Sequence, residues 1–103
     1  MKMVIVTAPM DKGVEIGRKI VEEKLAACVN LIPKVRSIYA WQGQIEDEEE
    51  VMMLCKTANA VVERLSWRIK ALHPYDVPEI IAVEIDENEG NPDYFKWVRD
   101  SVV

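Results

Sequence analysis

The chain has 103 residues, which is enough for one hydrophobic core and too few for two. Half of the residues are hydrophobic and 30% are charged, a balance typical of a globular domain and not of a disordered or membrane-spanning chain. The 18 acidic and 13 basic residues give a net charge of −5, which disfavours nucleic acid as a partner. We therefore expect a single domain over residues 1–103.

We expect a cytoplasmic location and no membrane partner. No charged-then-apolar signal segment precedes the first predicted element, and no apolar run could span a bilayer. The two cysteines, Cys28 and Cys55, lie in apolar runs and are not spaced as a C-x-x-C pair. Both are therefore predicted to be buried, reduced thiols rather than metal ligands or redox groups.

The first part of the chain predicts a strand followed by a helix. Residues 3–7 are apolar and rich in β-branched side chains, which indicates a strand buried on both faces and ended by Pro9. Asp11 is the candidate N-cap of the following helix. The predicted buried face of this helix consists of Val14, Ile16, Gly17, Ile20, Val21 and Leu25.

Residues 28–57 predict two long strands that form a hairpin around Gln42 and Gly43. The glycine supplies the positive φ that a two-residue hairpin turn requires. This turn sets the register, and it places Arg36 opposite Glu49 as a favourable charge pair. Pro33 interrupts the first strand, so we expect a bulge or an edge position there.

The predicted hairpin is too long for so small a domain to cover. Each strand is about twice the mean strand length. The distal half carries Ile38, Tyr39, Trp41 and Ile45, which lie beyond the reach of a small core. Exposed apolar and aromatic groups of this kind usually contact a partner, so we expect homo-oligomerisation through the hairpin.

An acidic run, residues 46–50, lies on the second strand of the hairpin. Side chains alternate along a strand, so Glu46, Glu48 and Glu50 point one way while Asp47 and Glu49 point the other. The five carboxylates cannot converge on one cation. The run therefore indicates a solvated strand face.

The last part of the chain predicts a helix, a strand and a second helix. Apolar residues from Val61 to Leu72 recur at helical spacing after a cap at Thr57 or Asn59, and the helix ends before Pro74. A strand over residues 79–85 places Ile81, Val83 and Ile85 on one side. Asn91 and Pro92 then begin a short helix that Tyr94, Phe95 and Trp97 anchor.

The order of the elements, β-α-β-β-α-β-α, predicts an α+β fold. It is a ferredoxin-like split β-α-β sandwich with a long central hairpin and an extra C-terminal helix. Right-handed crossovers place the first strand in the middle of the sheet.

This fold hosts many functions, so the function depends on individual residues. The first strand has no aromatic residue, which disfavours RNA recognition, and the loop after it has no cysteine pair for copper transfer. No nucleophile with a base and no glycine-rich phosphate loop is recognisable, so we do not expect an enzyme.

Three segments carry a resemblance to a known family. They are residues 22–33 (EEKLAACVNLIP), 37–57 (SIYAWQGQIEDEEEVMMLCKT) and 72–85 (LHPYDVPEIIAVEI). Together they resemble the CutA divalent-cation tolerance family over almost the whole chain. The resemblance implies a homotrimer packed through the hairpin and its Trp41, and a role in tolerance of copper and other divalent cations. We expect Tyr39 of the same hairpin to lie at this interface as well.

The same resemblance implies a metal site with three ligands, of which this chain keeps one. The family's cysteine position is Val6 here, its first histidine position is Leu72, and only His73 matches the second histidine. His73 is therefore the predicted ligand for copper or another divalent cation. A different role, ending the preceding helix beside the proline turn, is open for the same residue.

A second functional hypothesis follows from the resemblance of the family trimer to PII signalling proteins, which bind small ligands in clefts between subunits. Tyr75 and Asp76 lie on a loop, where binding groups concentrate. Lys34 and Arg36 on the hairpin are further candidates for the lining of such a cleft, beside Tyr39 and Trp41.

Overall fold

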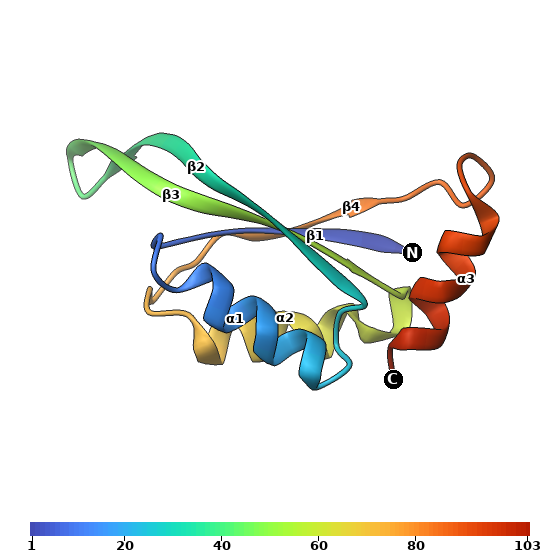
Figure 1. Cartoon of the computed structure of the whole chain (residues 1–103). Coiled ribbons are helices and arrows are strands. Elements are labelled where there is room, and N and C mark those ends of the chain that lie inside the picture. Colours follow the sequence, from blue (N-terminus) through green and yellow to red (C-terminus); the bar gives the residue numbers. More distant parts are fainter.

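The strands form one antiparallel sheet in the order β2-β3-β1-β4, and α1 and α2 cover one face of it (Figure 1). The computed structural model describes all 103 residues. In chain order the elements are β1 (Lys2–Ala8), α1 (Gly13–Glu22), β2 (Cys28–Trp41), β3 (Gln44–Thr57), the 3-10 turn η1 (Asn59–Val61), α2 (Val62–Leu72), β4 (Ile80–Glu84) and α3 (Pro92–Ser101). The predicted ferredoxin-like sandwich, its long hairpin and its central first strand are confirmed.

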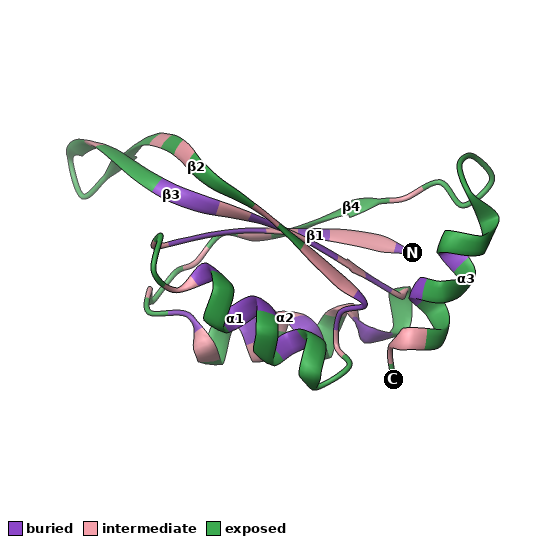
Figure 2. Ribbon diagram, viewed as in Figure 1, coloured by how far each residue is buried: buried purple, intermediate pink, exposed green.

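The core lies between the sheet and the two helices. Alternate residues of β1, Val4 and Val6, are fully buried there, together with Met53 of β3. From the helices, Ile20 and Leu65 fill the other side of this layer. Figure 2 shows this buried zone where α1 and α2 face the sheet, whereas the distal hairpin is mostly exposed. The period-2 pattern of the strands therefore directs one set of side chains into the core.

The opposite face of the sheet has no helix over it. Ile5 of β1 is paired with Leu54 of β3 and with Ile81 of β4, so these three side chains share that face. Ile81 and Val83 are 51% and 44% exposed. The predicted apolar side of the last strand therefore lies on the open face and not on the core.

The hairpin has the predicted register. Gln42 and Gly43 both have positive φ, 50° and 79°, and the strands shift register between Ile32 and Val35, next to Pro33. Arg36 lies opposite Glu49, as predicted, but its guanidinium contacts Asp47 at 2.7 Å, while Lys34 pairs with Glu49 at 3.4 Å. The bulge and the turn are thus confirmed, and the ion pairs run diagonally.

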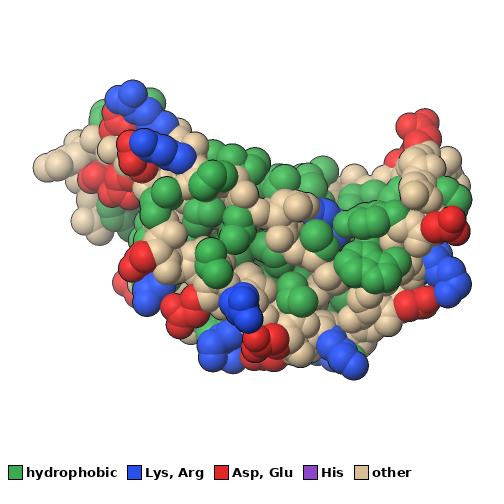
Figure 3. All heavy atoms as spheres, viewed as in Figure 1, with side chains coloured by type: hydrophobic (Ala, Val, Ile, Leu, Met, Phe, Trp, Pro, Cys, Tyr) green, Lys and Arg blue, Asp and Glu red, His purple; other side chains and the backbone are tan.

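Helix α1 buries a narrower stripe than the sequence predicts. Its buried residues are Gly13, Ile16, Gly17 and Ile20. Val14 and Val21 are exposed, and with Val29 and Leu31 of β2 they border a shallow hollow of about 310 Å³. Figure 3 shows hydrophobic side chains gathered over the middle of one face of the molecule, between the hairpin and α3. Gly13 lets the start of the helix lie close to Val51 of the sheet, and the two valines lie outside the buried stripe.

The predicted helix caps are confirmed at only one helix. The α1 helix follows Lys12 and has no side-chain cap, so the prediction for Asp11 is wrong. Neither Asn59 nor Thr57 caps the second helix, since neither η1 nor α2 has a side-chain cap. The Thr57 hydroxyl donates instead to the Leu25 carbonyl at 2.8 Å. Asn91 does cap α3, since its side chain accepts from the Asp93 amide at 3.0 Å.

The close approach of α1 gives a matched pair of predictions. A Cβ at Gly13 would lie 2.5 Å from a methyl of the buried Val51, whereas a Cβ at Gly17 would meet only ordinary contacts at 3.4 Å or more. We expect Gly13→Ala to lower the free energy of unfolding by about 1–3 kcal/mol through overpacking. Gly17→Ala should raise it by about 0.5–1 kcal/mol. Urea unfolding measures both, and equal changes at the two positions would contradict the packing.

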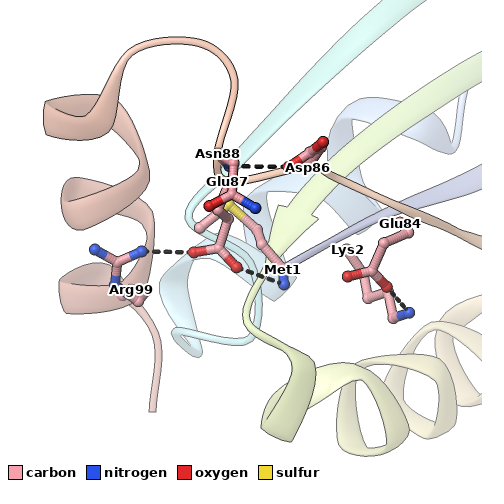
Figure 4. Close-up of polar contacts among 7 residues, drawn as sticks. All are labelled: Met1, Lys2, Glu84, Asp86, Glu87, Asn88 and Arg99. Carbon is pink, nitrogen blue, oxygen red and sulfur yellow. Dashed lines mark hydrogen bonds and ion pairs between the residues drawn. The ribbon is translucent and has the colours of Figure 1, made fainter.

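Helix α3 is attached to one end of the sheet by a small second core and by ion pairs. The amino group of Met1 contacts Glu87 at 3.0 Å, and the other carboxylate oxygen of Glu87 contacts Arg99 at 2.6 Å (Figure 4). Phe95 and Val98 pack beneath this network with Met1. These contacts place α3 far from the hairpin turn.

The cysteines are free thiols, Cys55 buried and Cys28 half-buried. Burial raises the pKa of the Cys55 thiol to about 12, so this thiol stays protonated. No helix is both long enough and apolar enough to cross a membrane.

Candidate functional site

A cavity of about 720 Å³ opens where the hairpin meets the connector that links α2 to β4, residues 73–79. Its volume lies within the range of small-molecule sites. The lining consists of Thr7, Ser37, Ile38, Tyr39, Trp41, Glu48, Glu50, Tyr75, Asp76, Val77, Pro78 and Glu79. The structure thus brings together Tyr39, Trp41, Tyr75 and Asp76, four of the predicted site residues.

Two tyrosines lie against two carboxylates in this cavity. The Tyr39 hydroxyl donates to Glu48 at 3.3 Å, and the Tyr75 hydroxyl donates to Glu50 at 3.2 Å. Glu48 and Glu50 are alternate residues of β3, so the strand presents both on the same face. Glu50 is only 4% exposed, which makes it the most buried carboxylate of the acidic run.

Both phenols remain protonated at neutral pH and act as donors. Burial, and after it the negative charge of Glu50, raises the pKa of Tyr75 to about 12. Burial and then Glu48 raise the pKa of Tyr39 as well. The tyrosines therefore hold the two carboxylates in place without neutralising them.

His73 joins the connector to the end of β1. Its Nε2 lies 2.7 Å from the Thr7 carbonyl and its Nδ1 accepts from the Tyr75 amide at 3.1 Å. A carbonyl can only accept and an amide N–H can only donate, so the ring is neutral, with its proton on Nε2. Helix α2 ends at Leu72, and His73 has extended backbone angles before Pro74. The predicted role at the helix end is confirmed.

The residues around His73 do not fit a metal centre. Both ring nitrogens are engaged with backbone groups, and the family's other ligand positions, Val6 and Leu72, are apolar. No three side chains of His, Cys, Asp or Glu are placed to hold a metal ion. Useful sites need three or four donors. Metal binding by His73 therefore stays a prediction, without support from the arrangement of donors.

The structure does not bring Lys34 and Arg36 to the large cavity. They line a separate hollow of about 560 Å³ together with Val35, Asp47, Glu48 and Glu49. There both cations are paired, Lys34 with Glu49 and Arg36 with Asp47. The predicted cleft residues thus divide between the two faces of the hairpin.

Sequence reasoning missed the carboxylates of the cavity, Glu48, Glu50 and Glu79. For the first two, a signal was available. The predicted register sets Tyr39 opposite Glu46, and alternation then places Glu48 and Glu50 on the face of Tyr39. Glu79 lies in the connector, where no periodic pattern indicates direction.

Comparison with known proteins identifies the family to which this chain belongs. The family described as CutA1 divalent ion tolerance protein matches residues 2–101. This chain belongs to the CutA family. The resemblance drawn from the three sequence segments is therefore confirmed over almost the whole chain.

Two CutA relatives show how much of each protein is shared. The divalent-cation tolerance protein CutA of Thermus thermophilus is 44% identical over 101 residues, which are 97% of this chain and 96% of that protein. Mouse protein CutA is 48% identical over 95 residues, 91% of this chain. The chain spans only 52% of the mouse protein's length.

Solved CutA structures confirm the fold. The PII-like protein CutA from Nostoc sp. PCC 7120, in apo form, superposes with a TM-score of 0.95 at 39% identity, over 100% of this chain and 98% of that one. The Thermus thermophilus divalent cation tolerance protein gives a TM-score of 0.93 at 43% identity, with both chains fully covered. CutA membership thus links the chain to divalent cations by family name and to PII proteins by architecture.

Proposed function

We propose that this CutA-family chain is a non-enzymatic binding protein whose ligand occupies the cavity between the hairpin and the connector. The observation that carries the proposal is the lining itself, where Tyr39, Trp41 and Tyr75 meet a few carboxylates. Small-molecule sites typically combine such aromatic walls with a small number of polar groups. His73, the only histidine, uses both nitrogens on the backbone and has none free to act as a base.

The proposal includes assembly into a homotrimer, as the family resemblance implies. Ile5, Ile81 and Val83 share a sheet face that no helix covers. At the hairpin, Tyr39 and Trp41 are also exposed. Exposed apolar and aromatic side chains gathered on one face are typical of subunit interfaces. A neighbouring subunit on this face would lie next to the cavity and complete its wall.

The alternative proposal is that the chain binds copper or another divalent cation through His73. The family's name supports the link with divalent cations. The donor arrangement favours the cavity proposal instead, because a metal at His73 would have to displace the Thr7 carbonyl or the Tyr75 amide from the ring. A cytoplasmic location belongs to both proposals.

Tryptophan emission can report binding at the cavity, because only one of the three tryptophans lines it. In the Trp67→Phe/Trp97→Phe variant, Trp41 is the sole emitter. We expect a panel of amines, amino acids, nucleotides and divalent metal ions to contain a ligand that shifts or quenches this emission saturably, since binding changes the surroundings of the indole.

The matched control keeps Trp67 as the sole emitter, in the variant Trp41→Phe/Trp97→Phe. Trp67 lies on α2 and is 75% exposed, outside the cavity lining. The same ligand should leave its emission unchanged. Equal responses from both variants would contradict binding in the cavity, and so would silence of Trp41 across the whole panel.

A further inference from the structure

The charged residues of the cavity all have one sign. Glu48, Glu50, Asp76 and Glu79 line it, and the lining includes no Lys or Arg. His73 is not part of the lining, and both of its ring nitrogens are engaged with backbone groups. A site with this lining repels anions and attracts cations.

Glu50 is the residue that sets the requirement for a cation. It is 4% exposed, lines the cavity and takes part in none of the ion pairs of the structure. The group that donates a hydrogen bond to Glu50 is the Tyr75 hydroxyl, which carries no charge. A buried carboxylate without a counter-charge is costly, and such charges in proteins are usually paired. No basic side chain of this chain forms an ion pair with Glu50.

The cations of the hairpin cannot supply that partner. Arg36 is held by Asp47 through two bonds of 2.8 and 2.7 Å, and Lys34 pairs with Glu49. Asp47 and Glu49 alternate with Glu48 and Glu50 along β3, so these pairs form on the other face of the strand. The sequence thus neutralises one face of its acidic run and leaves the other negative.

The aromatic lining narrows the kind of cation. A bare divalent ion needs several oxygens that converge on one point, and no three carboxylates of the chain do so. Tyr39, Trp41 and Tyr75 instead contribute aromatic rings to the lining. Aromatic rings attract ammonium groups, and Trp does so best. We propose that the cavity binds an organic ammonium ion, with Glu50 and Glu48 pairing its charge beside the aromatic rings. This inference rests on the function proposed above, because it names the ligand class of the same cavity.

Isothermal titration of the assembled protein tests the charge directly. The probes are choline, its neutral isostere 3,3-dimethylbutan-1-ol, putrescine, Mg²⁺ and L-glutamate. We expect choline or putrescine to bind, and the neutral isostere to bind about tenfold more weakly than choline or not at all. A preference for choline would identify a quaternary ammonium ligand, and a preference for putrescine a primary amine.

Matched variants on one strand localise the effect. Glu50→Gln keeps an acceptor for the Tyr75 hydroxyl and removes a buried charge, so the fold should persist while ammonium binding weakens about tenfold. Glu48→Gln, at an exposed position, should weaken binding in the same direction. Asp47→Asn changes the neighbouring residue on the other face and should leave the affinity unchanged.

Three outcomes would overturn the inference. They are equal affinity for choline and the isostere, binding of Mg²⁺ or glutamate without binding of either amine, and equal losses in Glu50→Gln and Asp47→Asn. If the amines fail while another ligand shifts the emission of Trp41, the ligand class is wrong and the proposed function stands. If no ligand of any class shifts that emission, both fail.

Discussion

His73→Ala is expected to lower the free energy of unfolding by about 2–4 kcal/mol, because the change removes two hydrogen bonds and leaves a space in a packed region. The imidazole is 7% exposed and bridges the Thr7 carbonyl and the Tyr75 amide. Both backbone groups would lose their partner. Denaturant unfolding in metal-free buffer, at one fixed protein concentration, measures the loss.

Two conservative variants separate this structural role from metal binding. His73→Gln retains a donor for the Thr7 carbonyl, and His73→Asn retains an acceptor for the Tyr75 amide, so each should keep about half of the lost stability. A chelator should not change the stability of the wild type. If His73→Ala unfolds like the wild type but loses Cu²⁺ affinity, the metal proposal is correct and the structural account of His73 is not.

Ile81→Lys is expected to dissociate the assembly. The side chain lies on the open sheet face, on the edge strand β4 beside Ile5 of β1, and it is 51% exposed in the single chain. A lysine there would place a charge inside an apolar interface, where unpaired charges are strongly disfavoured. Light scattering after size exclusion should give about three times the 11.8 kDa chain mass for the wild type and the single-chain mass for the variant.

The control is Trp67→Lys on the outer surface of α2. Trp67 is 75% exposed, more than Ile81, so exposure alone would predict the larger effect for this change. The proposed interface predicts no effect, because α2 lies on the opposite side of the sheet (Figure 1). Loss of assembly in the Trp67 variant together with its retention in the Ile81 variant would place the interface on the helices.

The sequence predicted the fold well where a local pattern carries long-range information. Alternation along β2 and β3 and the glycine of the turn define the register, and the bulge follows from Pro33. The face of α1 was harder to predict. Val14 and Val21 fit an apolar stripe by spacing, but they are exposed, whereas Gly13 and Gly17 are buried beside Ile16 and Ile20. Only at Gly13 is the approach to the sheet too tight for a side chain.

The site was predictable only in part, because strand alternation indicates direction on the hairpin but no such pattern exists in the connector. Tyr39 and Trp41 are two positions apart in β2 and share a strand face, whereas Lys34 and Arg36 lie at even-numbered positions and line the other hollow. The bond between His73 and Thr7 joins groups 66 residues apart. No pattern in the loop indicates that contact, because it depends on how α2 returns the chain to the end of β1.

The most direct test of the cavity as an ammonium site is the crystal structure of the assembled protein with saturating choline. We expect the trimethylammonium group within about 6 Å of the ring centre of Tyr39, Trp41 or Tyr75, next to the Glu50 carboxylate. Choline bound elsewhere on the protein, or a cavity that stays free of it at saturation, would show that the cavity is not an ammonium site.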